Sequence, residues 1–262
     1  MGERLSIVKL KPARVLDWGA FVGAGHAVLS EVYPKAAVTA VEADEERRAA
    51  TAAMRRPGWW KSLAGQGAPR VLRPADVTAG SAELLWANMV LHGVVDPQRE
   101  ISTWHQALAV DGFLMFSTLG PGSLRELTHL YEHLAWPAPL APFVDMHDLG
   151  DMLVQAGFAD PVMDQETLTL TWPSADALLS ELRLLGGNVG TQRPRGLRTP
   201  RWRAQLVQAL GSLAGPDGRI ALGLEIVYGH AFKPVPRPKM SGETAVSLDD
   251  MRAMVRRGGS AP

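Results

Sequence analysis

The sequence contains no cysteine and carries no net charge, and both absences exclude classes of chemistry. Without cysteine there is no disulfide, thiol nucleophile, thiolate-bound zinc or iron–sulfur cluster. The 27 basic and 27 acidic residues cancel, whereas a nucleic-acid-binding domain is normally basic. No stretch approaches the ~20 apolar residues of a membrane span, and residues 1–14 lack the apolar core of a signal peptide. We therefore expect a cytoplasmic protein without a nucleic-acid or membrane partner.

What is present is the composition of an ordinary globular chain, with 262 residues of which 46% are hydrophobic and 21% charged. In the first half, short apolar runs alternate with segments of helical periodicity. Strands are expected at 14–18, 36–44, 69–73, 83–90 and 111–118, and helices at 26–33, 44–54, 97–109 and 123–134. Such βαβ units predict a doubly wound α/β domain around a parallel sheet.

The second half predicts an antiparallel hairpin at the sheet edge and an insert within it. The runs 163–172 and 221–233 are the two expected strands, which complete a seven-stranded, mostly parallel sheet. Residues 174–219 lie between them and predict a helical cap built around a basic, proline- and glycine-rich loop. We expect one domain over 1–234, followed by a flexible C-terminal tail over 235–262.

A glycine-rich turn after the first strand is the sharpest local signal. Asp17 precedes Gly19 and Gly23, and Glu42 ends the second strand about 20 residues later, where an acid can bind both ribose hydroxyls. Such a turn and acid can bind either a nicotinamide or flavin dinucleotide or S-adenosylmethionine. The leading acid, Asp17, favours S-adenosylmethionine, because it can lie near the methionine end of that cofactor. The alternative is that the glycines only turn the chain.

Two more side chains extend this predicted cofactor site. Asp76 follows the third strand, where it can meet an adenine amine, and Asn88 ends the fourth strand at the edge of the sheet that binds ligands. No metal-binding spacing such as HExxH occurs, so no metal is expected, and there is no G-x-S-x-G elbow of a serine hydrolase. Together these features resemble the class I S-adenosylmethionine-dependent methyltransferases, a Rossmann-like fold.

A narrower resemblance covers the chain from Pro12 to Lys233. The segments PARVLDWG, ALAVDGFLMFSTLGPGSLREL, FVDMHDLGDMLVQAGFADPVMD, LTLTW, RGLRTPRWR and EIVYGHAFK are similar to the malonyl-acyl-carrier-protein O-methyltransferases of biotin synthesis. The resemblance implies S-adenosylmethionine as cofactor and a malonyl thioester as substrate, whose free carboxylate is methylated. It also implies an acyl carrier protein as partner, with another small carboxylic acid as the other acceptor to consider.

The chain departs from that family on the cofactor side. Phe21 replaces a glycine of the family's D-L-G-C-G-T-G turn, and its ring would project toward the cofactor unless the loop takes another route. The loop after Asp76 is short, and only 13 residues precede the first strand, so the family's N-terminal helix is expected to be absent. An alternative function is therefore a catalytically impaired homologue that binds an acyl carrier or protein partner. A third is an enzyme whose lid comes from a second chain.

Methyl transfer to a carboxylate needs no catalytic base, because the acceptor is already ionised at neutral pH. The protein must orient two substrates and exclude water, so no catalytic residue is assigned. Arg198 and Arg201 of the insert can grip a carboxylate or a carrier-protein phosphate, or they form a solvated basic loop. Tyr228 and His230 share one strand face, which looks either into the active site or into the core. His92, four positions after Asn88, completes the predicted substrate-binding set.

Overall fold

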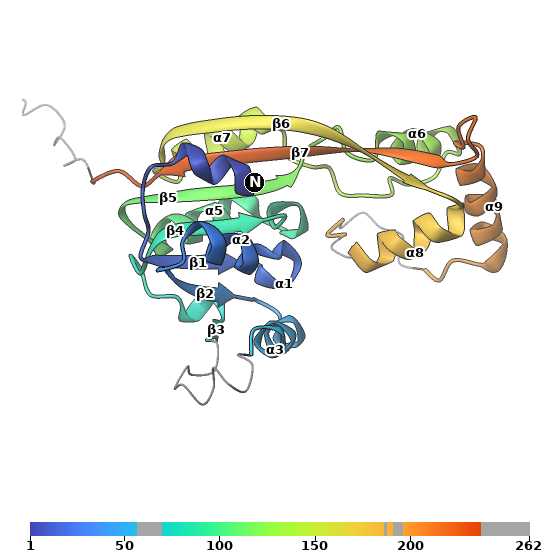
Figure 1. Ribbon diagram of the computed structural model, residues 1–262. Helices are drawn as coiled ribbons and strands as arrows, with labels where there is room; N and C mark the ends of the chain where they lie inside the picture. The colour runs from blue at the N-terminus through green and yellow to red at the C-terminus, as the bar shows by residue number, and fades with distance from the viewer. Residues whose placement is uncertain (57–69, 186–187, 191–195, 237–262) are drawn as a thin grey trace, which may run out of the picture.

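A computed structural model of the chain describes residues 1–56, 70–185, 188–190 and 196–236. Its centre is a seven-stranded sheet of order β3-β2-β1-β4-β5-β7-β6 (Figure 1). Neighbouring strands are parallel except that β7 runs antiparallel to both β5 and β6. The strands are β1 (Arg14–Trp18), β2 (Ala37–Val41), β3 (Val71–Leu72), β4 (Ala82–Asn88), β5 (Leu108–Leu119), β6 (Ala159–Trp172) and β7 (Ile220–Phe232). The expected doubly wound, mostly parallel sheet is confirmed.

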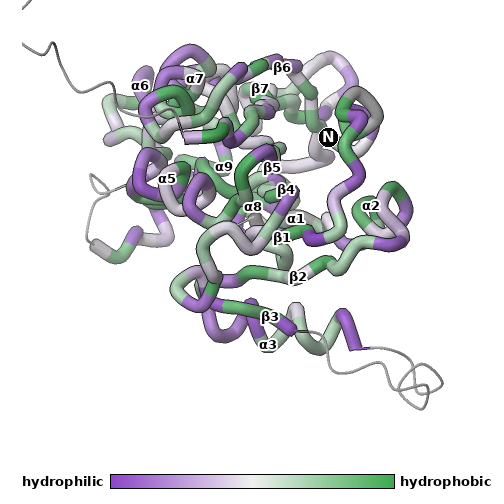
Figure 2. Tube along the Cα trace, turned by 90° about the vertical axis from the view of Figure 1, so that its left-hand side faces the viewer, coloured by the Kyte–Doolittle hydropathy of each residue, from purple (hydrophilic) through white to green (hydrophobic). Residues whose placement is uncertain are grey.

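Helices cover both faces of the sheet, as Figure 2 shows for α2 and α5 on opposite sides of β1 and β4. On one face, Trp18 and Phe116 of the sheet pack with Trp104 of α5 and with α7. On the other face, Val15 and Trp86 pack with Leu29 of α2 and with η1. These side chains are almost fully buried, which is the main source of the fold's stability. The helices are η1 (Gly2–Ile7), α1 (Ala20–Gly23), α2 (Gly25–Val32), α3 (Glu45–Met54), η2 (Pro74–Asp76), η3 (Leu91–Gly93), α5 (Pro97–Ala107), α6 (Arg125–His133), α7 (Met146–Gln155), α8 (Ala175–Leu185) and α9 (Pro200–Gly211).

The β6–β7 hairpin continues beyond the rest of the sheet and carries a second core. The pairing of β7 with β5 ends at Ile226, whereas its pairing with β6 continues to Ile220. Around this extension α6, α8 and α9 form an arm, at the right of Figure 1. Trp172, Leu178 and Leu210 are at most 4% exposed in its core. The expected helices between the last two strands are thus present.

Several elements differ from the sequence-based expectation, among them β5, which begins at Leu108 although a helix is expected to continue to residue 109. β6 begins at Ala159 rather than at residue 163, with a register irregularity between Ala159 and Val162. Pro161 is tolerated there because β6 is an edge strand and its outer side needs no N–H donor. Residues 2–7, where no element was expected, form η1, and Leu5 is 1% exposed against α2 and β1.

Part of the expected tail lies outside the described residues, from 237 onward. Across the ranges that the structure describes, none of the helices combines the length and the apolarity that crossing a membrane requires. Within the same ranges, no three histidine, aspartate or glutamate side chains are grouped as metal ligands.

Candidate active site

Gly19 gives the turn after β1 its shape. Its φ is +68°, in the left-handed region that glycine adopts without strain, and its N–H donates to the carbonyl oxygen of Val41 at 2.9 Å. A Cβ on Gly19 would lie 2.7 Å from Cγ2 of Val90. The chain then forms the single helical turn α1, which ends at Gly23. Both predicted glycines therefore belong to a tight turn at the carboxyl end of β1.

Asp17 is fully buried at this edge and forms an ion pair with Arg55. The Arg55 side chain, which directly follows α3, is 8% exposed. Burial raises the pKa of Asp17, and the guanidinium of Arg55 opposes that rise. Oδ1 of Asp17 has no hydrogen-bond partner in the described part of the chain. The carboxylate thus already has one cation and retains one unsatisfied acceptor.

Glu42 is the second buried carboxylate at this edge, 4% exposed, and it accepts the backbone N–H of Phe21. Burial raises the pKa of Glu42, with the Phe21 N–H as the largest opposing effect. The ring of Phe21 is 41% exposed and lies in an open hollow with Asp44, Arg47 and Ala50. The loop here forms a helical turn, and Phe21 borders a hollow that it shares with residues of α3.

Asp76 and Asn88 differ in how they are held. Arg73 donates two hydrogen bonds to Asp76, at 2.7 and 2.8 Å, and holds the pKa of that exposed carboxyl below its usual value. Asn88, at the end of β4, accepts a hydrogen bond from Oγ of Ser117 at 2.6 Å. The N–H of Met89 donates to the same Ser117 oxygen at 3.1 Å. Asn88 therefore links the ends of β4 and β5.

The two carboxylates at this edge of the sheet suit S-adenosylmethionine. That molecule carries an ammonium and a ribose diol, both of which bind carboxylates, and Asp17 and Glu42 stand at the ends of the adjacent strands β1 and β2. The unsatisfied oxygen of Asp17 agrees with a ligand here, whereas the close approach at Gly19 is to the Val90 side chain of the protein itself. Arg55 is the competing cation that the sequence did not reveal.

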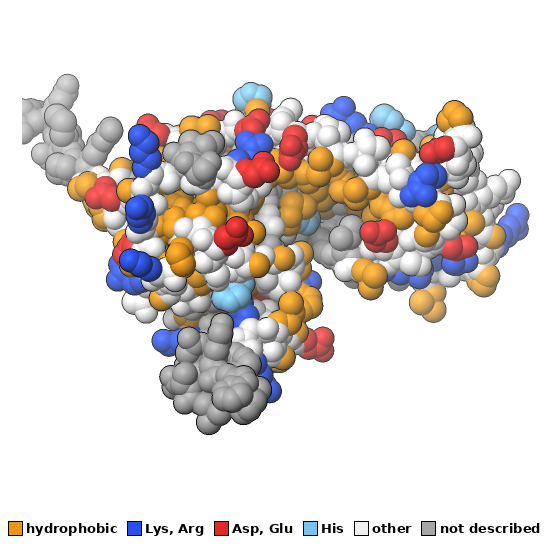
Figure 3. Space-filling view, in the orientation of Figure 1, with side chains coloured by type: hydrophobic (Ala, Val, Ile, Leu, Met, Phe, Trp, Pro, Cys, Tyr) orange, Lys and Arg blue, Asp and Glu red, His pale blue; other side chains and the backbone are white. Residues whose placement is uncertain are grey.

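A separate cavity of about 370 Å³ lies at the carboxyl ends of β4 and β5. Figure 3 shows the molecule hollowed between the core and the arm, with hydrophobic side chains gathered above the hollow. The walls come from η3, the end of β5, α7, the segment 138–144 and the insert. The lining residues that the structure describes include no Asp, Glu, Lys or Arg: Leu91, His92, Val94, Val95, Pro97, Thr118, Leu119, Ala138, Leu140, Ala141, Pro142, Phe143, Val144, Leu149, Val189 and Gly190.

The insert reaches the cavity through Val189 and Gly190. Nδ2 of Asn188 donates to the carbonyl oxygen of Pro139 at 2.7 Å, and the N–H of Gly190 donates to Oδ1 of Asn188 at 3.0 Å. These bonds fix the insert to the segment 138–144. The insert, which is expected to form a cap, and the segment 138–144 therefore close the cavity together. The contact between them joins distant residues, and no motif marks it.

The FSTLGPGSL segment holds the β5 side of the cavity in place. The N–H of Gly120 donates to the carbonyl oxygen of Glu225 on β7 at 2.9 Å. The carboxylate of Glu225 accepts the N–H of Gly122 at 3.3 Å, and a Cβ on either glycine would collide with it. Oγ of Ser123 bonds the backbone of the same residue twice, at 3.0 Å. These contacts fix the turn that follows Thr118.

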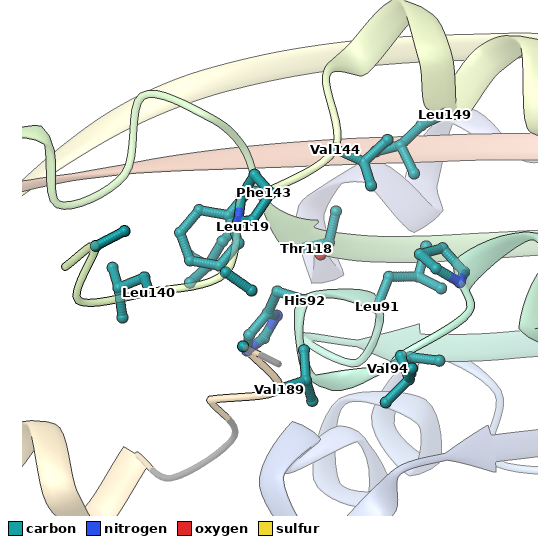
Figure 4. A pocket seen from close by; sticks show the side chains of 16 residues that line it. Leu91, His92, Val94, Thr118, Leu119, Leu140, Phe143, Val144, Leu149 and Val189 are labelled. Atoms are coloured by element: carbon teal, nitrogen blue, oxygen red, sulfur yellow. The ribbon is translucent and has the colours of Figure 1, made fainter. Parts of the chain in front are cut away.

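His92 is the one predicted substrate-binding residue that lines this cavity, from η3 (Figure 4). Its ring meets Phe143 edge-on, with the two ring centroids 6.4 Å apart. Nδ1 is buried without a hydrogen-bond partner among the described residues, and burial lowers the pKa of the ring. The imidazole is therefore uncharged at neutral pH.

The other four predicted substrate-binding residues lie outside the cavity lining. The hydroxyl of Tyr228 donates to Glu166, and the guanidinium of Arg4 lies 4.2 Å from the centre of its ring. His230 packs edge-on against Phe232, with centroids 6.1 Å apart. Tyr228 and His230 do share a face of β7, but it is the face covered by the N-terminal segment rather than the cavity face.

Arg198 and Arg201 are exposed on the arm. The guanidinium of Arg198 stacks over the ring of Trp202, 4.6 Å from its centre, and Arg201 lies in the first turn of α9. Neither residue is among those that line the cavity, so the role of these arginines in gripping a carboxylate or a carrier-protein phosphate stays a prediction.

Comparison with known proteins places these observations in a family. A model of a methyltransferase domain matches residues 2–160. The malonyl-[acyl-carrier protein] O-methyltransferase of Gallionella capsiferriformans is 38% identical over 94% of this chain and 86% of that protein. The enzyme of the same name from Laribacter hongkongensis is 35% identical over the whole of this chain and 88% of that protein.

Solved structures show the same fold at low identity. The YcgJ protein of Bacillus subtilis has a TM-score of 0.57 at 14% identity, over 90% of this chain and 98% of that one. A putative methyltransferase of Bacillus halodurans has a TM-score of 0.56 at 16% identity, over 89% and 98%. The fold is thus that of the class I methyltransferases, and the chain belongs to the malonyl-[acyl-carrier protein] O-methyltransferase family.

Proposed function

We propose that this protein methylates the free carboxylate of a malonyl thioester carried by an acyl carrier protein, with S-adenosylmethionine as methyl donor, in the synthesis of the biotin precursor. The observation that carries the proposal is the pairing of two sites at one sheet edge. The buried carboxylates of Asp17 and Glu42, here called the donor site, lie at the ends of β1 and β2, and a cavity with no charged residue among its described lining lies at the ends of β4 and β5. Bound S-adenosylmethionine supplies an electrophilic methyl group on a sulfonium.

The residues at the ends of β1 and β2 are assigned to the binding of S-adenosylmethionine. Asp17 would hold its ammonium in competition with Arg55, and Glu42 would accept its ribose hydroxyls while it keeps the Phe21 N–H. Gly19 and Gly23 form the turn beside it, and Asn88 stands between the two sites. Asp76, which pairs with Arg73 at the surface, is assigned to the adenine end.

The arm is assigned to the acceptor. Val189 and Gly190 close the cavity, so α8 and α9 act as a cap that excludes water from the reacting groups. Arg198 and Arg201, exposed on that arm, suit the acidic surface or phosphate of a carrier protein better than a carboxylate inside the cavity. The impaired-homologue alternative gains no support from the relatives, which are named as O-methyltransferases.

The proposal predicts that the full-length protein adds one methyl ester to malonyl-acyl carrier protein in the presence of S-adenosylmethionine. Acetyl-acyl carrier protein, which offers the same thioester and no free carboxylate, is the matched control and should gain nothing. Intact-protein mass spectrometry of the carrier measures both reactions. No methylation of the malonyl form at saturating S-adenosylmethionine would contradict the proposed function.

A further inference from the structure

Two residues that line the cavity at the ends of β4 and β5 each carry a buried polar atom without a hydrogen-bond partner in the described part of the chain. Thr118 is 2% exposed and His92 lies opposite it on η3, and neither Oγ1 of Thr118 nor Nδ1 of His92 has a hydrogen-bond partner among the described residues. Figure 4 shows the side chains of Thr118 and His92 among the lining residues, with Phe143 and Val189 on other walls of the cavity. Buried polar groups are almost always paired in folded proteins, so two orphans lining one cavity point to a ligand.

The chemistry of the lining limits what that ligand contacts. The remaining lining residues are apolar apart from backbone groups, and none is charged. The described lining can therefore give a carboxylate in this cavity hydrogen bonds but no countercharge. Among the described residues the arginines of the insert do not reach it, as the exposed positions of Arg198 and Arg201 show.

An uncharged environment suits methyl transfer between an anion and a cation. One carboxylate oxygen forms a bond to the methyl carbon while the carbon–sulfur bond breaks. The electron pair of the broken bond goes to sulfur. No proton moves, and two opposite charges disappear. Because charge is dispersed in the transition state, apolar walls favour it over the ionised ground state. A lysine or arginine at this position would instead stabilise the unreacted carboxylate.

We propose that the Thr118 hydroxyl and the His92 imidazole are two hydrogen-bonding contacts of the malonyl head group, in an acceptor site whose described lining carries no countercharge. This inference rests on the proposed function and assigns residues to its acceptor. Thr118 donates from the end of β5, and His92, held edge-on by Phe143, presents Nδ1 from η3. The backbone contacts of Gly120 and Gly122 with Glu225 fix the turn after Thr118.

Thr118→Val tests the hydroxyl, because valine keeps the shape and removes the polar atom. We expect kcat/KM for malonyl-acyl carrier protein to fall about 10- to 100-fold, the value of a hydrogen bond to a charged group. The KM for S-adenosylmethionine should stay within about twofold, and Thr118→Ser should restore most of the rate. Since the hydroxyl is unpaired in the free protein, Thr118→Val should also raise Tm by about 2 °C.

His92→Phe and His92→Asn form the second pair. Phenylalanine keeps the ring without a polar atom, and asparagine restores one near the position of Nδ1. We expect His92→Phe to lose rate to a similar extent and His92→Asn to recover part of it. Val94→Ala, another cavity position without a polar atom, serves as the control for altered packing.

The outcomes separate this inference from the proposed function. If the wild type methylates no malonyl thioester, the proposed function fails. If the wild type is active and Thr118→Val matches it in kcat/KM, the assignment of Thr118 is overturned. A Thr118→Val variant that loses activity and Tm together, without rescue by Thr118→Ser, would show that the hydroxyl is structural and would also overturn it.

Discussion

Replacing Arg55 with methionine is expected to lower the free energy of unfolding by about 3–5 kcal/mol, the usual cost of removing one partner from a buried ion pair. Asp17 is 0% exposed and the Arg55 side chain 8%, so the carboxylate would be left without water or a cation. One oxygen of Asp17 is already unpaired. Chemical denaturation monitored by tryptophan fluorescence measures the difference.

Arg48→Met is the matched control for this loss. Arg48 lies on the same helix and pairs with Glu45, whose side chain is 79% exposed, and such surface pairs contribute about 0–1 kcal/mol. Combining Arg55→Met with Asp17→Leu removes both charges and should recover most of the loss. Equal unfolding free energies for Arg55→Met and Arg48→Met would contradict the buried pair.

The Arg55→Met deficit should depend on pH. Burial raises the pKa of Asp17 and loss of Arg55 raises it further, so the folded variant binds this proton more tightly than the unfolded chain. Below the ordinary aspartate pKa of about 4 both states are protonated and the deficit is smallest. It grows as the pH rises from there through the folded-state pKa. A deficit that shrinks with rising pH would contradict this assignment.

Glu42→Gln is expected to weaken the binding of S-adenosylhomocysteine about 10- to 100-fold, the value of hydrogen bonds to a charged group. Glutamine can still accept the Phe21 N–H with its amide oxygen, so the loop stays in place. Its NH₂ group cannot accept the second ribose hydroxyl. Isothermal titration calorimetry measures the affinity.

Glu46→Gln is the control, because Glu46 is an exposed carboxylate four residues further on, beside the Phe21 hollow. The affinity of the Glu46→Gln variant for S-adenosylhomocysteine should stay within about twofold of the wild-type value. If Glu42→Gln binds as tightly as Glu46→Gln does, Glu42 does not hold the ribose and the donor site assigned to the β2 end is wrong.

The sequence predicts the sheet well because its signals are local. Apolar runs fix the strands, and caps fix helix starts, as Asp44 does by accepting the N–H of Arg47 at 2.9 Å. The start of β6 was misplaced because Asp160 and Pro161 are typical of a turn, and only the edge position of the strand makes them compatible with pairing.

The candidate sites were less predictable because their decisive contacts join distant residues. Arg55 reaches Asp17 from 38 positions away, and no motif marks it. Tyr228 and His230 were correctly expected to share a face, but only the packing of Arg4 on Tyr228 shows which face it is. The direction of the Phe21 ring depends on a helical turn that its glycine-rich context did not reveal.

The central claim is that the donor site formed by Asp17 and Glu42 still binds S-adenosylmethionine, although Phe21 replaces a family glycine and Arg55 pairs with Asp17. Isothermal titration of S-adenosylhomocysteine into the wild-type protein tests it most directly. We predict saturable binding to one site per chain with a Kd of about 1–100 μM, in the range usual for enzyme substrates. Absence of heat and of saturation at about 1 mM ligand, where a Kd of that size gives near-complete occupancy, would contradict it.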